Sequence, residues 1–419
     1  MLIWIAGLLI IAMLSVVAID IGLVSREWFG RIRIGRFHQT LEWNEAITVA
    51  GIKWLNHTPT IKLTDQSRLV VIDMLRGNYK RNAIQHWQEA ALLLGLSEYL
   101  RYNDNPSMVN EIQKYMQKHF HTNGAWKQKP QFIDVGILAF SLMKLPVIEE
   151  SRYKPALDEV WSLIQSHIGK DGTVAYRKHM EHYRYVDTIG FICPFLIRYG
   201  LRFGKKECVA LAVKQLEQYE KFGMLEKLYL PGHAYHIDTG APAGLYGWGR
   251  GLGWYAIGLI DSWMELPDHH EYKHTLETMV RKFSKTVIQY QHPSGYWTWS
   301  VSRYESRADS STTATLAWFL EQASNIPELH KVCREGVQKA KDYLLKVTRR
   351  NGAVDFSQGD TKDLGVYSMH FSILPFTQGF AIRLANANRK HEVSRNGKED
   401  VELHSGKIQE VAVRGKVAR

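Results

Sequence analysis

Apolar residues recur at three- and four-residue spacing along almost the whole chain beyond residue 40, and alternating, strand-like segments are nearly absent. Such spacing places apolar side chains on one face of a helix, so the sequence predicts a succession of helices and an all-α fold. The predicted helices lie near residues 41–55, 81–102, 106–119, 131–145, 153–168, 184–201, 205–220, 248–264, 271–290, 308–324, 329–347 and 367–387.

A turn-forming pair of residues recurs between the predicted helices, each time followed closely by an aromatic or β-branched side chain. Its glycines are Gly124, Gly172, Gly295 and Gly352, and such pairs are typical of turns. A repeat of about fifty residues indicates a repeated pair of helices. We therefore predict six helical hairpins that close into an (α/α)6 toroid over residues 41–388, with the inner helices beginning just after the repeated turns. An open solenoid is the alternative, but the last predicted helix is apolar rather than a polar cap, which favours a closed ring.

The amino-terminal segment has a different character. It carries no charge from Leu2 to Ile19, and after Asp20 the apolar run continues to Val24. This stretch is long enough to span a bilayer. A cleaved signal peptide usually begins with Lys or Arg and ends at a cleavage site of small residues. Here the leading charge is absent and the candidate cleavage site is poor. The sequence therefore predicts a single transmembrane helix that acts as an uncleaved anchor, residues 1–25.

Arginines follow the anchor within a predicted basic linker, residues 26–40. Arg26, Arg31, Arg33 and Arg36 all fall in this linker. Membrane proteins tend to keep such charges on the cytoplasmic side. The expected location is therefore the bacterial inner membrane, with the following domain in the cytoplasm, and a periplasmic domain is the alternative.

More than half of the formal net charge of +11 is carried by two short segments near the ends of the chain. The linker is one of these segments, and the other is a polar and charged stretch, residues 389–419, which we predict to be a disordered basic tail. The charge that remains on the body is too diffuse for a nucleic-acid surface, and no zinc-ligand spacing occurs. We expect no metal, no organic cofactor and no nucleic-acid partner. The three cysteines, Cys193, Cys208 and Cys333, are far apart, which indicates free buried thiols rather than disulfides.

One segment, residues 246–254, alternates four glycines with two tryptophans and an arginine. Tryptophan faces stack on sugar rings, and a fixed guanidinium holds a carboxylate with two hydrogen bonds. Trp248, Arg250 and Trp254 are therefore candidates to bind an acidic oligosaccharide or polysaccharide. The alternative is that the glycines allow close helix packing and that both tryptophans belong to the core.

Two aspartates head apolar helices in neighbouring repeats. Asp134 begins the helix predicted near 131–145, and Asp187 begins the one near 184–201. Glycosidic chemistry needs such a pair, one carboxyl to donate a proton and one carboxylate to stabilise charge or activate water. The alternative is that each aspartate only caps its helix.

Four elements together give the chain a family resemblance: residues 133–136, 185–188, 248–251 and 374–380. In order and spacing they resemble the unsaturated glucuronyl and rhamnogalacturonyl hydrolases, glycoside hydrolase families 88 and 105. The resemblance implies a six-hairpin toroid that acts on an unsaturated uronic acid at a non-reducing end. It implies that Asp187 protonates the ring double bond and activates the hydrating water, and that Asp134 orients the substrate.

The resemblance also suggests further substrate-binding residues. His233 or His236 is similar to a cleft histidine of the family, although a loop histidine is commonly solvated. Trp297 is a candidate to stack on a sugar, with a packed-core role as the alternative. Arg307 is a candidate for a substrate carboxylate, with a solvated surface charge as the alternative.

Two positions depart from the family pattern. Leu252 stands where relatives usually carry a polar amide close to the reacting water, and Ile133 stands where they often carry histidine. With the anchor, these departures suggest a specialised branch attached to capsule or exopolysaccharide assembly. The leading hypothesis is a hydrolase of unsaturated uronides. The alternatives are an inverting hydrolase of a saturated acidic polysaccharide and a non-catalytic glycan-binding scaffold.

Overall fold

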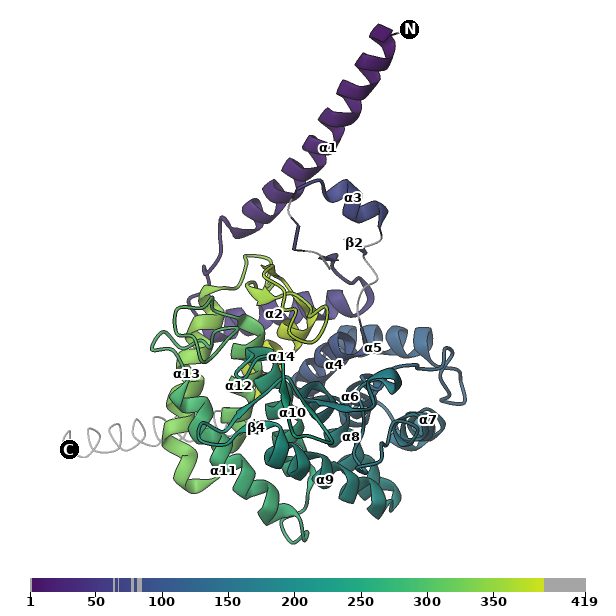
Figure 1. The fold of residues 1–419 in the computed structure, drawn as a ribbon, viewed down its shortest axis with the longest axis vertical. Helices are drawn as coiled ribbons and strands as arrows, with labels where there is room; N and C mark the ends of the chain where they lie inside the picture. Colours follow the sequence, from purple (N-terminus) through teal and green to yellow (C-terminus); the bar gives the residue numbers. More distant parts are fainter. Residues whose placement is uncertain (1, 63–64, 67, 77–78, 81–84, 388–419) are drawn as a thin grey trace, which may run out of the picture.

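Six helices lie side by side around the middle of the protein in a computed structural model, which describes residues 2–62, 65–66, 68–76, 79–80 and 85–387. Each packs against the next, and the last packs against the first, so the ring is closed (Figure 1). The predicted tail, residues 389–419, lies outside the described residues. The inner helices are α4 (His86–Leu100), α6 (Val135–Lys144), α8 (Val186–Phe203), α10 (Gly249–Glu265), α12 (Ser310–Ala323) and α14 (Pro375–Asn386).

An outer layer of helices covers the inner ring; five of its helices pack on an inner neighbour, and α5 packs on α2. Outer helices bury one stripe only: α13, for example, buries residues at the three- and four-residue spacing of an amphipathic helix. Inner helices are covered on both sides, so every residue of α12 is buried. This arrangement confirms the predicted six-hairpin toroid. The outer helices are α2 (Thr40–Asn56), α5 (Pro106–His119), α7 (Lys154–Gln165), α9 (Lys206–Phe222), α11 (Lys273–Gln289) and α13 (His330–Lys346).

Short strands and single helical turns complete the described part of the chain. The strands pair antiparallel as β1–β2, β3–β6–β7, β4–β5 and β8–β9, with Tyr183 opposite His236 in the second sheet. Segments of two or three residues leave no alternating pattern that the sequence could reveal. They are β1 (Ile61–Lys62), β2 (Tyr79–Lys80), β3 (Tyr183–Tyr185), β4 (Met224–Leu225), β5 (Leu230–Pro231), β6 (Ala234–His236), β7 (Pro242–Ala243), β8 (Ser357–Gln358) and β9 (Phe371–Ser372), with helix α3 (Val70–Leu75) and the 3-10 turns η1 (Glu150–Tyr153), η2 (Lys178–Met180) and η3 (Pro327–Leu329).

The repeated turns occupy equivalent places in the ring. Their glycines all have positive φ, between 72° and 94°. At Gly124, Gly295 and Gly352, a β-carbon would lie 1.8 to 2.1 Å from the backbone carbonyl oxygen of Arg152, Lys339 and Ala46, respectively. Only glycine permits both the backbone angle and this close approach. The repeat therefore marks the places where one hairpin is joined to the next.

The last inner helix begins later than the sequence predicts. The predicted start near residue 367 is wrong, because α14 begins at Pro375. The residues before it form an irregular hairpin in which β8 pairs with β9. We refer to residues 355–372 as the β8–β9 segment.

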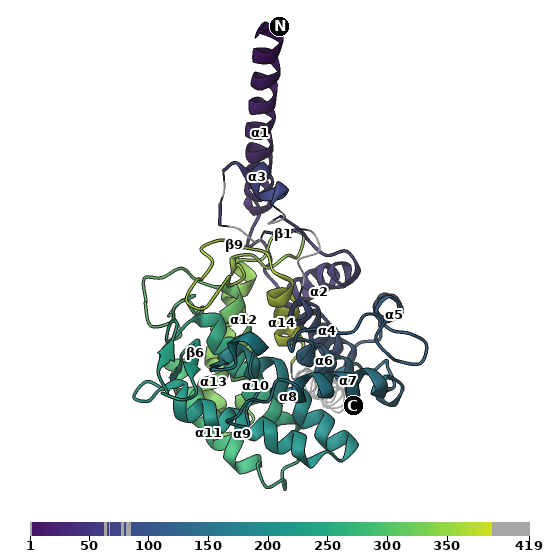
Figure 2. The same cartoon turned by 45° about the vertical axis from the view of Figure 1, so that its right-hand side comes forward.

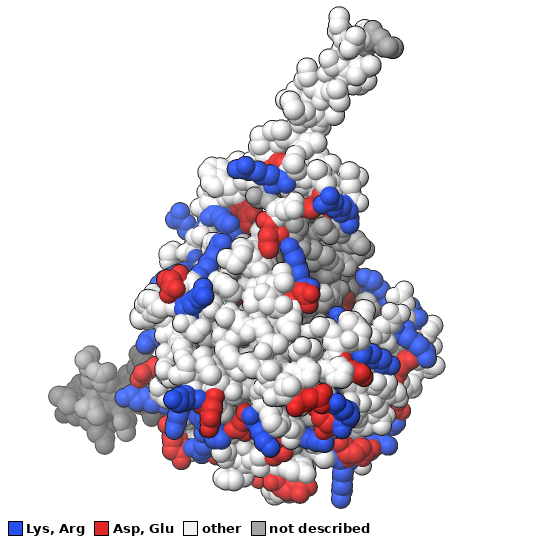
Figure 3. Space-filling model, in the orientation of Figure 1, with Lys and Arg blue, Asp and Glu red and all other residues white. Residues whose placement is uncertain are grey.

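Helix α1 (Leu2–Arg31) stands out from the toroid (Figures 1 and 2). It extends past the predicted anchor, so the first residues of the predicted linker are helical. The outer part of α1 shows no charged side chain in Figure 3, and none of its 18-residue apolar window is buried. Its length and composition suit a membrane span or a signal sequence.

The carboxyl end of α1 is held on the β8–β9 segment. Arg31 donates from Nε to Asp355 Oδ2 at 2.8 Å and from Nη2 to Asp355 Oδ1 at 3.0 Å. It also donates to the carbonyl oxygen of Phe371 at 2.9 Å. Asp355 is fully buried, and its second cation is Arg349, at 2.7 Å. A buried carboxylate with two guanidinium partners is a firm attachment point for this helix.

Arg31→Ala is expected to loosen the β8–β9 segment, because the buried carboxylate of Asp355 loses one of its two cations. Amide hydrogen exchange of this segment in the full chain should rise on the order of tenfold, while exchange in the inner helices stays unchanged. Arg33→Ala is the matched control, since Arg33 is exposed. Equal exchange in both variants would show that α1 does not hold the segment.

Candidate active site

A cavity of about 460 Å³ lies beside the first turns of α8 and α10, and part of the β8–β9 segment forms one of its walls. Its size suits a small ligand. Three arginine or lysine side chains and three aspartates line it, so the lining combines both charges. The lining residues are Gln85, Trp87, Tyr176, Arg177, His179, Met180, Tyr185, Asp187, Phe191, His233, Trp248, Arg250, Trp254, Asp360, Thr361, Lys362, Asp363 and Leu364.

Asp187 lies in the first turn of α8 and lines this cavity. Its Oδ2 atom is buried and has no hydrogen-bond partner among the described residues. Burial raises the pKa of Asp187 from 3.8 to about 7, although the guanidinium of Arg250 opposes the rise. A carboxyl with these properties holds a proton near neutral pH and has no internal acceptor for it, as a general acid requires.

Asp134 lies at the start of α6, next to α8 in the inner ring. Burial raises its pKa to about 6, while the charges of His86 and Arg177 and a hydrogen bond from the backbone of Trp87 oppose the rise. Its Oδ1 atom is buried without a partner among the described residues. Asp134 itself does not line the cavity, so the structure places only one of the two predicted aspartates on the cavity wall.

Both carboxyl groups affect the pKa of Tyr176. Burial raises its pKa, and the charges of Asp187 and Asp134 both add to the rise. Tyr176 lines the cavity. The two aspartates therefore belong to one electrostatic neighbourhood, although Asp134 is set back from the cavity surface.

A third aspartate shows what a simple helix cap looks like in this ring. Asp309 precedes α12, and its side chain accepts hydrogen bonds from the backbone N–H groups of Ser311 at 3.0 Å and Thr312 at 3.2 Å. The side chain of Asp134 makes no such bond to its own helix. Asp187 is one residue inside α8 rather than at its cap. The capping alternative therefore accounts for Asp309 and leaves Asp134 and Asp187 unexplained.

Arg250 and Trp248 hold the cavity wall in place. Arg250 donates from Nη2 to the carbonyl oxygens of Gln358 and Gly359, the latter at 2.7 Å. Trp248 donates from Nε1 to Gln358 Oε1 at 3.0 Å. The Nε and Nη1 atoms of Arg250 are buried and have no hydrogen-bond partner among the described residues. Part of this guanidinium is thus free to bind an anion in the cavity.

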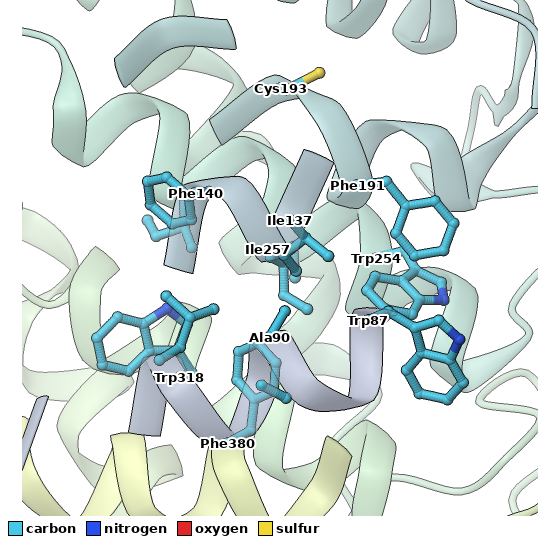
Figure 4. Packing of buried hydrophobic residues seen from close by; sticks show 14 of the residues in the cluster. Trp87, Ala90, Ile137, Phe140, Phe191, Cys193, Trp254, Ile257, Trp318 and Phe380 are labelled. Atoms are coloured by element: carbon cyan, nitrogen blue, oxygen red, sulfur yellow. The ribbon is translucent and has the colours of Figure 1, made fainter. Parts of the chain in front are cut away.

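Trp254 is packed in the core and also lines the cavity. It is 2% exposed and packs edge to face against Phe191 and Trp87, so it belongs to the core and also lines the cavity (Figure 4). A β-carbon at Gly249 or Gly253 would lie within 2.5 Å of a threonine hydroxyl of α12. The glycines therefore bring α10 close to α12, and the tryptophans on either side of this glycine pair, Trp248 and Trp254, line the cavity.

His233 lies 3.6 Å from Asp187, measured from Nε2 to Oδ2. Burial lowers the pKa of His233 to about 4, so the imidazole is neutral when Asp187 is protonated. The pair is therefore not an ion pair at neutral pH. The Nδ1 atom lies 3.2 Å from the hydroxyl of Tyr367, which fixes the ring beside the carboxyl group.

Three predicted substrate-binding residues do not line this cavity. Trp297 is fully buried and donates from Nε1 to the carbonyl oxygen of Val287 at 2.8 Å, so it is a core residue. Arg307 is exposed and stacks on Phe371 at 4.4 Å. His236 points to a different group, described next.

His236 lies beside His182 and Asp238, and the possible ligand atoms of these three residues fall within 4.8 Å of one another. Lys170 already forms an ion pair with Asp238 at 2.6 Å. A cation in contact with the carboxylate opposes the binding of a metal ion there.

Sequence reasoning missed several lining residues, among them Trp87, Tyr176, Arg177 and Asp360. Arg177 stacks on Phe132 at 4.3 Å and on Tyr176 at 4.6 Å. Tyr176 and Arg177 follow the repeated turn at Gly172 closely, and this position was the available signal. Asp360 gave no signal, because it lies in the irregular hairpin that was predicted in part as helix.

Leu252 and Ile133 are both fully buried, and neither lines the cavity. Leu252→Gln is therefore expected to place an amide in the core and to lower the free energy of unfolding by about 2–4 kcal/mol. Urea unfolding followed by tryptophan fluorescence measures this loss. Leu252→Met is the control and should cost less than about 1.5 kcal/mol. Unchanged stability with faster turnover would instead mean that the amide reaches water in the cavity.

The closed double ring and its cavity, with buried carboxyl groups, an arginine and tryptophans, define an (α/α)6-toroid protein of the glycoside hydrolase class. The model of Glycosyl Hydrolase Family 88 matches residues 61–374, and the chain belongs to this family. It is therefore a glycoside hydrolase. A search of curated proteins found no match.

Solved structures share the fold at low identity. A possible member of family 105 from Salmonella enterica serovar Paratyphi A is 16% identical, with a TM-score of 0.69 over 85% of this chain and 96% of that chain. An unsaturated glucuronyl hydrolase specific for heparin is 13% identical, with a TM-score of 0.65 over 84% and 98%. An unsaturated glucuronyl hydrolase from Bacillus sp. GL1, responsible for the degradation of glycosaminoglycan, is 14% identical, with a TM-score of 0.59 over 84% and 97%.

Proposed function

We propose that this glycoside hydrolase hydrates the double bond of an unsaturated uronic acid at the non-reducing end of an acidic oligosaccharide. The observation that carries the proposal is the carboxyl of Asp187, which lines the cavity, has a buried Oδ2 atom without a hydrogen-bond partner among the described residues and has a pKa of about 7. Two of the structurally similar proteins are described as unsaturated glucuronyl hydrolases, which supports the same substrate class.

The reaction needs one group that gives a proton and takes one back. Asp187 donates its proton to the C4 carbon of the C4=C5 double bond, which leaves positive charge at C5 and on the ring oxygen. Water then adds to C5 and returns a proton to the Asp187 carboxylate. The resulting hemiketal opens and releases the next sugar, so the net change is the addition of one water molecule. Asp134, ionised above its pKa of about 6, stabilises the positive charge from outside the cavity lining.

The substrate carboxylate is attached to C5 and conjugated with the double bond. A cation is needed to bind its negative charge. Arg250 is suited to this task, because its Nε and Nη1 atoms are buried in the cavity region and lack partners among the described residues. Trp248 and Trp254 supply the aromatic faces for the sugar ring.

The direct test is to incubate the full chain with an unsaturated uronyl disaccharide and to follow loss of the ultraviolet absorbance of the conjugated double bond. Loss of absorbance supports the proposal. Release of sugars from a saturated acidic polysaccharide, without turnover of the unsaturated substrate, would favour the inverting hydrolase. Binding without turnover of either substrate would favour the non-catalytic scaffold in polysaccharide assembly.

We also propose that α1 is an uncleaved anchor in a bacterial inner membrane, with the toroid in the cytoplasm. The attachment of Arg31 to Asp355 supports an uncleaved helix, because the carboxyl end of α1 is bonded to a buried residue of the toroid. The arginines that follow the apolar stretch support the cytoplasmic side. Protease added to intact spheroplasts should leave the toroid uncut, and cleavage before lysis would place it in the periplasm.

A further inference from the structure

Asp20 is the one charged residue within the apolar part of α1, and its carboxylate has a defined partner. Oδ2 accepts a hydrogen bond from the backbone N–H of Leu69 at 2.6 Å, and Oδ1 accepts one from Val70 at 2.9 Å. These N–H groups belong to the start of α3. Asp20 therefore fastens α3 to the side of α1 at one level along the helix.

The surface of α3 is unusual for a protein in water. Leu69 is 53% exposed, Ile72 is 43% exposed and Leu75 is 83% exposed. Arg68 and Arg76 flank these residues and are exposed as well. Apolar side chains that face outward, with arginines at their edge, are typical of helices that lie in a membrane surface.

The level of α3 along α1 agrees with the thickness of a membrane. The uncharged stretch from Leu2 to Ile19 is about 27 Å long at 1.5 Å per residue. The hydrocarbon core of a bilayer is about 30 Å thick. Asp20, and α3 with it, then lies at the edge of this core. Figures 1 and 2 show α3 beside α1, between its outer part and the toroid, and running across the direction of α1.

We propose that α3 is a second membrane contact, with Leu69, Ile72 and Leu75 placed among the lipid chains just below the headgroups. Arg68 and Arg76 then face the lipid phosphates. The inference rests on the proposal that α1 spans a membrane. It adds that the protein touches the bilayer at two points, so the toroid is held at a fixed orientation rather than on a free tether.

A single labelled cysteine tests this contact in the full chain. Cys193, Cys208 and Cys333 are fully buried, so an added exposed cysteine is the reactive one. Leu75→Cys is labelled with an environment-sensitive dye in nanodiscs of phosphatidylcholine and phosphatidylglycerol. Blue-shifted emission, and quenching by nitroxides attached high on the lipid chains, are expected. Val332→Cys on α13 is the matched control, 38% exposed, and should show neither effect.

A third label separates this inference from the anchor itself. Leu9→Cys, 66% exposed on α1, reports insertion of that helix through quenching by nitroxides deep in the bilayer. Quenching at residue 9 with none at residue 75 would overturn the contact of α3 and leave the anchor standing. No quenching at either position would overturn both. Shielding of residue 75 from aqueous iodide without nitroxide quenching would mean that protein covers α3, which also overturns the proposal.

Discussion

Asp187→Asn is expected to lower kcat on an unsaturated uronyl disaccharide by about 10³-fold, because asparagine keeps the shape of the side chain and has no acidic proton to give. KM should change little, since the cavity keeps its lining. The loss of ultraviolet absorbance under saturating substrate measures kcat. Asp238→Asn is the matched control, because Asp238 is exposed and does not line the cavity.

The same substitution is expected to stabilise the fold at alkaline pH, which separates lost chemistry from lost structure. Burial raises the pKa of Asp187 from 3.8 to about 7. In the wild type, stability is therefore lost as the pH rises from about 4 to about 7, by on the order of 4 kcal/mol in total. Asparagine stays neutral and avoids this loss. Urea unfolding at pH 8 should show the variant to be more stable than the wild type, with a smaller difference at pH 4. Full activity in Asp187→Asn would contradict the catalytic assignment.

The sequence predicted the ring because each hairpin repeats the same local requirements. The repeated glycines need positive φ and close contact, and the inner helices need apolar residues on both sides, so both features are visible in the residues themselves. The position of Asp187 at the start of an apolar inner helix follows from the same repeat. These parts of the structure are determined by short segments, which a single sequence can reveal.

The β8–β9 segment could not be predicted, because distant residues hold it. Arg250 and Trp248 bind Gln358 from α10, and Arg31 binds Asp355 from α1. No local sequence pattern predicts contacts between such distant residues, so Asp360 and its neighbours were not predicted to line the cavity. For Trp297 the sequence left a sugar-stacking role and a core role open, because a tryptophan after a turn has the same local sequence whether it faces a cavity or the core.

The pH dependence of kcat is expected to form a narrow bell, with limbs at about 6 and about 7. Burial raises the pKa of Asp134 to about 6 and that of Asp187 to about 7. Asp134 stabilises positive charge only when ionised, so the rate should fall tenfold per pH unit below about 6. Asp187 donates only when protonated, so the rate should fall tenfold per pH unit above about 7.

Asp134→Asn assigns the acidic limb. The variant should turn over more slowly at its optimum, and its rate should stay level as the pH falls below 6, because the group that loses its charge there is gone. His233→Gln is the matched control: burial lowers the pKa of His233 to about 4, so the imidazole is neutral throughout and both limbs should keep their positions. An acidic limb that persists unchanged in Asp134→Asn would show that another group must be ionised. Asp360, a half-buried carboxyl in the same cavity whose pKa is also raised by desolvation, would then be the residue to test.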